Sequence, residues 1–339
     1  MAKTALVLGG GGLVGMAYHA GALKALHDAR LRPAGADVIV GTSAGAIIAS
    51  YLAAGWEGDD FYEYAHGRHR DVHKDPDDQQ EVVRQLFAPL WETPVQRAQR
   101  SIGSLFAIAS SRGFWRGGRR GQVPHGALRR AFPSGLYSTE RTRQRLNEDL
   151  PREWPRENLF ICAADLYSGE PAPFGKEGAP KAPLPDAVLA STAIPGLFPP
   201  VKIGDRHYVD GGIVSATSLS LAVEEGCDVI LCVAPLGYRG EGGLLAADPR
   251  IWPAMVSRQL FARTLRREVR EAREKGCEVL VIRPWLEELA ALGVNAMRHF
   301  DRSAITDAAC GGARRVLDDH RHHPVIEAFK RSDKKEKTG

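Results

Sequence analysis

The sequence has few cysteines, no long apolar run and almost no net charge. No window approaches the roughly 18 uncharged apolar residues of a membrane-spanning helix, and the apolar stretch near the N-terminus is too short for a signal peptide. The five cysteines are odd in number, widely spaced and without a CxxC pair, which argues against a disulfide framework or a zinc site. We therefore expect reduced, mostly buried thiols and a cytoplasmic protein.

The charges nearly cancel over the 339 residues. Lys and Arg number 45 and Asp and Glu 41, and the resulting net charge of +4 is too weak to argue for nucleic-acid binding. Because 44% of the residues are hydrophobic, the chain can bury a sizeable core. We expect one domain over residues 1–329, with a helical insertion or cap at about 56–155 and a charged, disordered tail at 330–339.

The first 55 residues contain two strand-turn-helix units. Residues 4–8 form an apolar, β-favouring run that ends in four glycines, and residues 16–29 carry apolar residues at helical spacing. A second short strand at 37–40 stops at Gly41 and is followed by a helix at 44–54. This alternation predicts a largely parallel α/β sheet. Later strands are expected at 159–163, 201–210, 228–234 and 278–282, and Gly204-Asp205 is expected to form a hairpin turn within 201–210. A closing helix is expected at 305–329, with a break at Pro324.

A serine motif joins the second strand to its helix. Gly41-Thr42-Ser43-Ala44-Gly45 fits G-x-S-x-G, in which the serine occupies a strained, closely packed turn that excludes bulky neighbours. The hydroxyl would lie at the positive end of a helix dipole, which favours an oxyanion nearby. We interpret Ser43 as a nucleophile, and a purely structural turn is the alternative.

The glycine run after the first strand has two interpretations. Gly10-x-Gly12-x-x-Gly15 formally matches the dinucleotide-binding fingerprint, but the same loop can present backbone N–H groups as an oxyanion hole. A dinucleotide site needs an acidic residue at the end of the second strand. Here Asp37 begins that strand and Ser43 follows its end, so the oxyanion interpretation is favoured.

An ordinary α/β-hydrolase triad is the closer rival, because it also combines G-x-S-x-G with a later acid and a histidine. In that fold several strands precede the serine, whereas Ser43 follows only the second predicted strand. No candidate histidine stands at a strand end or between glycines; the candidates are His299, His320, His322 and His323.

Four glycine-bearing blocks together resemble the patatin-like phospholipases in identity, order and spacing. They are the loop 9–15 with the Met-Ala-Tyr-His-Ala-Gly-Ala-Leu that follows it, the serine motif 41–45, the segment 190–201 (Ala-Ser-Thr-Ala-Ile-Pro-Gly-Leu-Phe-Pro-Pro-Val), and Asp210-Gly211-Gly212. The resemblance runs from residue 4 to about 235. Val14 stands where many members carry Lys or Arg, so the sequence does not support a role for a cation at this position. The backbone N–H donors of the loop do not depend on that cation.

The resemblance implies a three-layer αβα sandwich with a mostly parallel central sheet, and a Ser-Asp dyad without histidine. Ser43 would be the nucleophile and Asp210 its base, with N–H groups around Gly10, Gly11 and Gly12 as the oxyanion hole. The motifs are completed by Gly15, Gly41, Gly45, Gly211 and Gly212. From the residues alone, Asp210 ends a strand before two glycines that let the backbone approach another turn, and a mere hairpin turn is the alternative.

These observations predict a hydrolase of lipid or other acyl esters that works through an acyl-enzyme, of the phospholipase, lysophospholipase or esterase kind. We expect no metal and no cofactor, because no Cys/His/Asp cluster has ligand spacing. The alternative from another functional class is a lipid-binding regulator that has lost its catalytic activity. Retention of both Ser43 and Asp210 argues against it.

Two basic regions suggest weak, peripheral contact with anionic membranes. The mostly apolar segment 103–115 runs into Arg116, Arg119 and Arg120. A later helix would present a cationic face, formed by Arg263, Arg266, Arg267, Arg270 and Arg273. Acidic residues interleave with these arginines, so a solvated helix laced with ion pairs is the alternative; they are Glu268, Glu271 and Glu274.

Overall fold

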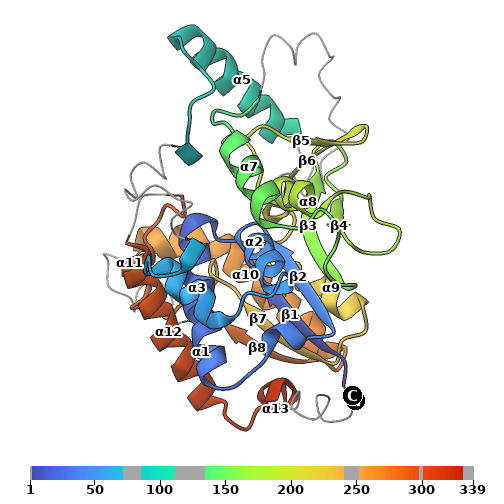
Figure 1. Ribbon diagram of the computed structural model, residues 1–339, viewed down its shortest axis with the longest axis vertical. Helices are drawn as coiled ribbons and strands as arrows, with labels where there is room; N and C mark the ends of the chain where they lie inside the picture. The colour runs from blue at the N-terminus through green and yellow to red at the C-terminus, as the bar shows by residue number, and fades with distance from the viewer. Residues whose placement is uncertain (1, 72–84, 111–133, 240–251, 298–300, 331–339) are drawn as a thin grey trace. The chain divides into compact units, whose positions relative to one another are not determined.

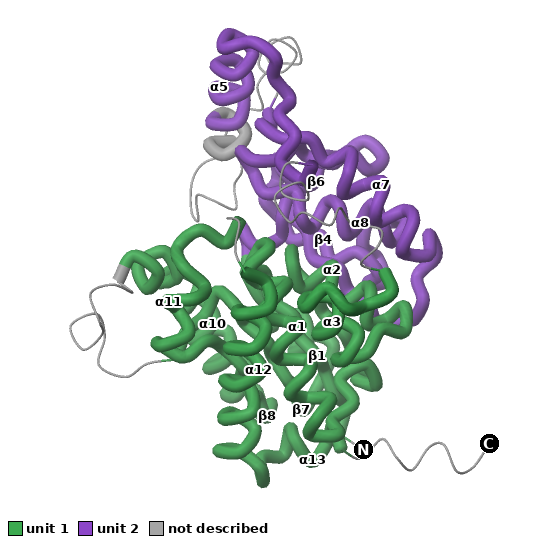
Figure 2. The backbone as a smooth tube through the Cα atoms, turned by 60° about the vertical axis from the view of Figure 1, so that its left-hand side comes forward, with its two compact units in different colours: residues 1–74, 215–339 green, residues 75–214 purple. Residues whose placement is uncertain are grey.

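The computed structural model describes residues 2–71, 85–110, 134–239, 252–297 and 301–330 (Figure 1). The chain divides into two compact units (Figure 2). The first unit combines residues 1–74 with 215–339, and the second comprises residues 75–214. The N-terminal and C-terminal parts of the chain therefore fold together.

A parallel sheet forms the centre of the first unit. Its strands lie in the order β2-β1-β7-β8, and each neighbouring pair is parallel. The strands are nearly buried on both faces, which explains why they are continuous runs of Val, Ile, Leu and Ala rather than alternating patterns. Their bounds are Thr4–Leu8 for β1, Val38–Thr42 for β2, Val229–Val233 for β7 and Glu278–Ile282 for β8.

Helices cover this sheet (Figure 1). They are α1 (Gly12–Asp28), α2 (Ala44–Ala53), α3 (Gly58–Ala65), α9 (Leu219–Glu224), α10 (Trp252–Glu274), α11 (Leu289–Leu292), α12 (Arg302–Asp319) and α13 (Pro324–Lys330). Helices α1 and α12 approach closely at Gly21, where any side chain would overlap the Thr306 carbonyl. The Thr306 hydroxyl also donates to the Ala17 carbonyl at 3.1 Å. This contact fixes the helix that begins at the glycine loop.

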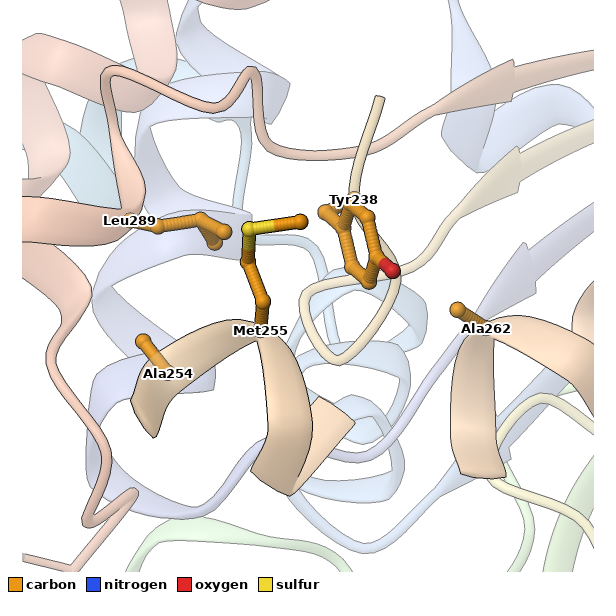
Figure 3. Packing of buried hydrophobic residues seen from close by; sticks show 5 residues of the cluster. All are labelled: Tyr238, Ala254, Met255, Ala262 and Leu289. Carbon is orange, nitrogen blue, oxygen red and sulfur yellow. The ribbon is translucent and has the colours of Figure 1, made fainter. Parts of the chain in front are cut away.

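A separate apolar cluster packs α10 against the loops beyond the sheet. Figure 3 shows Tyr238 and Leu289 packed against Met255, with Ala254 and Ala262 alongside. The Tyr238 hydroxyl donates to the Gln259 side-chain oxygen at 2.5 Å, so the ring is fixed at both ends. The cluster anchors the segment after β7 to α10.

The second unit is built on antiparallel pairs. β3 (Leu159–Asp165) pairs with β4 (Pro171–Phe174) and with β6 (Arg206–Asp210), which in turn pairs with β5 (Val201–Ile203). Gly204 has φ +61° in the predicted two-residue hairpin turn between β5 and β6. The unit also carries α5 (Pro94–Ser110), α7 (Glu140–Asp149) and α8 (Leu184–Ser191).

Most predicted elements appear within two or three residues of their expected ends, but β4, α8 and the short helix α11 were missed and two others differ. β2 continues through Gly41 to Thr42, and α1 begins four residues early at Gly12. The expected break of the closing helix at Pro324 is confirmed. Two parts of the expected helical insertion, residues 72–84 and 111–133, lie outside the described residues, and so does the tail from 331 on.

The thiol prediction is confirmed, because all five cysteines are free and buried. Across the described parts of the chain, no helix is both long and apolar enough to cross a bilayer.

Candidate active site

Ser43 lies at a strained turn between β2 and α2. Its φ of 54° and ψ of −120° place a residue other than glycine in a region that L residues seldom adopt. The residue is only 6% exposed. Its carbonyl accepts the first hydrogen bond of α2, from Ala46 N–H at 2.9 Å. The predicted strand-turn-helix setting of the serine is therefore present.

The two glycines of the motif are required by packing. A Cβ on Gly41 would lie 2.7 Å from both Ala46 Cα and the Gly45 carbonyl oxygen. A Cβ on Gly45 would overlap the Leu8 carbonyl at the end of β1. Neither obstacle is a flexible side chain, so any larger residue would have to move the backbone. The turn that holds Ser43 thus rests directly on the first strand.

The glycine loop after β1 runs beside Ser43. A Cβ on Gly10 would lie 3.3 Å from Ser43 Cβ. Gly9 N–H donates to Val233 O at 2.9 Å and Gly10 N–H donates to Ala216 O at 2.7 Å. In contrast, no acceptor for the N–H groups of Gly11 and Gly12 is found among the residues that the structure describes. These two donors also belong to the N-terminus of α1, where anions are stabilised.

The far side of this loop is closed by backbone contacts. A Cβ on Gly11 would lie 2.6 Å from Gly15 Cα, which accounts for glycine at position 11. Val14, whose side chain is buried, donates its N–H to Ala296 O at 3.1 Å. The departure from the family pattern at Val14 therefore places an apolar side chain inside the first unit.

A buried histidine that sequence reasoning did not single out supports the loop from below. His19 on α1 is fully buried, and its Nε2 lies 2.7 Å from the Gly9 carbonyl. Burial lowers its pKa to about 4, so the ring is neutral near pH 7. A carbonyl can only accept, so Nε2 must carry the proton and donate it. A histidine in an otherwise apolar helix, one turn beyond the glycine motif, was the available signal.

Three of the four rival histidines lie at the wrong edge of the parallel sheet. His323 Nε2 is 3.9 Å from Glu278 Oε2, and Glu278 begins β8. Ser43 follows the carboxyl end of the parallel strand β2, and a five-residue strand separates the two edges by roughly 16 Å. His320 and His322 belong to the same segment, in which His320 Nδ1 lies 2.9 Å from Val316 O. His299 lies outside the described residues.

Asp210 belongs to the second unit, at the end of β6. It is 5% exposed, and its Oδ1 accepts a hydrogen bond from Gly212 N–H at 2.7 Å. This bond caps a short 3₁₀ turn, Gly211–Ile213, so Asp210-Gly211 is not a hairpin turn. A Cβ on Gly211 would overlap the Cys162 carbonyl of β3.

The segment 190–201 is hydrogen-bonded to the end of β6 and to the neighbouring strand β3. Asp210 N–H donates to Ala193 O at 3.0 Å, and the Ser191 hydroxyl donates to Cys162 O at 2.6 Å. Both contacts tie the segment to the strands that carry Asp210. In the described ranges, no group of three or more His, Cys, Asp or Glu side chains could hold a metal ion.

The glycine loop, the serine motif and the Asp210 segment described above lie within a part of the chain that matches a known protein family. The model of the family described as patatin-like phospholipase matches residues 6–223. The chain belongs to this family. Membership confirms the expected fold class, the patatin-like αβα sandwich with a mixed, mostly parallel central sheet, and supports lipid acyl hydrolysis at the level of the family.

Solved structures with similar folds include VipD and a type III effector protein. VipD from Legionella pneumophila is 17% identical with a TM-score of 0.43, over 94% of this chain and 67% of VipD. The type III effector ExoU is 18% identical with a TM-score of 0.38, over 95% of this chain and 54% of ExoU. A complex of ExoU with SpcU from Pseudomonas aeruginosa is also similar, at 18% identity and a TM-score of 0.39, over 94% of this chain and 52% of that one. This patatin-like chain thus spans about half of the ExoU chains.

Proposed function

We propose that the protein is a serine acyl-ester hydrolase of lipids in which Ser43 attacks the acyl carbonyl and Asp210 takes its proton. The observation that carries the proposal is the strained, positive-φ backbone of Ser43 beside Gly10, whose missing side chain leaves space next to the serine. Family membership supports the same class of reaction.

The proposed reaction proceeds in two steps. Ser43 Oγ forms an ester bond with the acyl carbon, and the alcohol leaves with the proton that Asp210 had accepted. Water then attacks the acyl-enzyme while Asp210 takes a proton from it. The bond between the acyl carbon and Ser43 Oγ breaks, the fatty acid leaves, and Asp210 returns the proton to Ser43 Oγ. Gly212 N–H holds one carboxylate oxygen of Asp210 and thereby orients the other.

The developing oxyanion would be stabilised by Gly11 and Gly12. Gly10 was predicted to take part, but its N–H already donates to Ala216 O, so its role in the proposal is to leave space beside Ser43. Two N–H donors at a helix N-terminus are sufficient for an oxyanion hole. A substituent on either glycine would also displace backbone or Met297, which lies against Gly12.

A fluorophosphonate probe tests the nucleophile directly. We expect the purified protein to be labelled at Ser43, and the Ser43→Ala variant to take no label. Ser50→Ala is the matched control, because Ser50 lies on the same helix and its hydroxyl only donates to Ala46 O at 2.8 Å. A folded protein that binds lipid but takes no probe would instead support the lipid-binding regulator.

We also infer weak contact with anionic lipid surfaces, made by α5 rather than α10. On α10, ion pairs use two of the arginines, Arg267 with Glu271 at 3.6 Å and Arg270 with Glu274 at 3.7 Å, which favours the solvated alternative. On α5, the exposed side chains include Val95 at 68% and Leu105 at 66%. The helix sequence contains arginines but no Asp or Glu. The basic residues predicted at 116–120 lie outside the described residues.

A further inference from the structure

Two arginines come together beyond the carboxyl ends of β7 and β8. Arg239 follows β7, and its N–H donates to Pro284 O at 2.6 Å. Arg283 immediately follows β8, and its Cβ lies 3.5 Å from the Cβ position of Gly237. Arg239 also forms a parallel bridge with Trp285, and its guanidinium carbon lies 4.7 Å from the centre of the indole ring. The two segments that carry the arginines are therefore direct neighbours.

Neither guanidinium has a carboxylate partner in the described part of the chain. No ion pair of Arg239 or Arg283 is formed there, and Arg239 Nη1 is buried without a hydrogen-bond acceptor. Burial lowers the pKa of Arg283, and the positive charges of Arg239 and Arg266 lower it further. Both arginines are half-buried, and placing like charges side by side in such a position is costly unless an opposite charge accompanies them.

Two more buried side chains at this place, Tyr18 and Glu288, each have one oxygen without a hydrogen-bond partner among the described residues. Tyr18 on α1 is fully buried, and its hydroxyl has no hydrogen bond in the described residues. Its pKa is raised by burial and by Glu288, and lowered by Arg239, Arg283 and Arg315, so both arginines of this place act on it. One oxygen of Glu288 accepts Trp285 N–H at 2.9 Å, while the other, Oε1, is buried without a donor. Burial raises the Glu288 pKa to about 7, so this carboxyl does not fully neutralise the arginines.

The place itself is one where α/β proteins bind ligands. In open parallel sheets, ligands bind in the crevice beyond the carboxyl ends of the strands. The glycine loop lies at the same edge, since a Cβ on Gly11 would be 3.0 Å from Pro235 Cβ in the loop after β7. The arginines thus follow the two strands next in order after the strand that carries the glycine loop.

We propose that Arg239 and Arg283, with the Tyr18 hydroxyl, bind a phosphate-type oxyanion beyond the carboxyl ends of β7 and β8. The buried Nη1 of Arg239 and the Tyr18 O–H supply donors, and the two guanidinium charges match a doubly charged phosphate group. Exposed Arg266 on α10 adds to the positive potential. The ligand is either free phosphate or the phosphate of an ester headgroup.

Binding of inorganic phosphate to the full chain, measured by calorimetry at constant ionic strength, tests this site. We use the Ser43→Ala variant as the background, so that the result does not depend on catalysis. Saturable binding is expected, weakened at least tenfold by Arg239→Gln or Arg283→Gln and severalfold by Tyr18→Phe. Arg270→Gln is the control, because Arg270 is exposed on α10 and only faces Glu274 at 3.7 Å; it should change affinity less than twofold.

The proposal is overturned if phosphate does not bind saturably, or if Arg239→Gln and Arg283→Gln bind it as well as Arg270→Gln does. Circular dichroism of each variant separates loss of the site from loss of the fold, and Tyr18→Phe gives a second test that keeps the ring in place. A further comparison identifies the source of the anion. If phosphate competitively inhibits hydrolysis of a short-chain phosphatidic acid but not of p-nitrophenyl butyrate, the site takes the headgroup; if it inhibits neither, the ligand is free phosphate.

Discussion

At the residue scale, the hydroxyl of Ser43 is the atom on which the proposed chemistry depends. Ser43→Ala should leave the fold unchanged and reduce turnover of short-chain acyl esters by roughly a thousandfold or more, because no other group would form the acyl-enzyme. The measurement is kcat for p-nitrophenyl butyrate, with Ser50→Ala as the control. A Ser43→Ala variant that keeps more than a tenth of the turnover would show that another residue is the nucleophile.

The base is tested at Asp210. Asp210→Asn should cost several orders of magnitude in kcat, because the amide cannot accept the serine proton although it can still accept from Gly212 N–H. Activity of the unchanged protein should persist well below pH 6.5, where an imidazole base would become protonated. The His299→Gln variant tests the remaining rival, which is a histidine base at position 299. The separate variant His322→Gln, at an exposed position, is its control. Complete inactivity of folded His299→Gln would require a histidine base.

His19 offers a test of the support beneath the glycine loop. His19→Leu leaves the Gly9 carbonyl without its donor, which should cost about 1–3 kcal/mol of unfolding free energy and lower kcat about tenfold. His19→Gln can place a side-chain N–H near the same carbonyl and should restore much of both. Urea unfolding and steady-state kinetics measure the two effects. Equal stability and activity of the Leu variant would mean that the loop does not need this bond.

At the scale of single elements, α5 carries the inferred lipid contact. Replacing Val95, Ile102 and Leu105 by Ser should abolish sedimentation with anionic vesicles at low salt while hydrolysis of soluble esters continues, since the change affects only exposed apolar side chains. The control is Val256→Ser with Leu260→Ser, which removes the exposed apolar pair of α10. Loss of sedimentation in the control alone would assign the contact to α10 instead.

Elements with a strong local signal were predictable from the sequence, and those determined by distant contacts were not. β1 and β8 have the predicted bounds because each is a run of four apolar residues after one polar residue. β4 was missed because two of its four residues are prolines, which are rare inside strands and here pair with one neighbour, β3.

The candidate site follows the same division. The elbow at Ser43 and the glycine loop are local patterns, so both were predictable. The engagement of Gly10 N–H with Ala216 depends on a residue more than two hundred positions away, and no local pattern could reveal it. His19 escaped for the same reason, because its role depends on complete burial under the loop.

At the scale of the whole molecule, two buried ionisable groups give stability opposite pH dependences. The pKa of Glu288 is raised in the folded protein, so the stability that it contributes is present below its unfolded-state pKa and is lost as pH rises towards 7. His19 has a lowered pKa, so its contribution is lost as pH falls from 6.5 towards 4. The unfolding free energy of Glu288→Gln, relative to that of the unchanged protein, should therefore increase by about 2 kcal/mol from pH 5 to pH 8. A constant difference in urea unfolding across that range would contradict the assignment.

The burial of all five thiols has a practical consequence for spectroscopy. Burial raises the pKa of Cys227 to about 11 and that of Cys232 further, so neither forms a reactive thiolate at neutral pH. A single cysteine introduced at an exposed position, such as Val95 on α5, should then react with a maleimide fluorophore far faster than the native thiols do. The protein can thus carry a site-specific dye for membrane-proximity measurements without prior removal of its own cysteines.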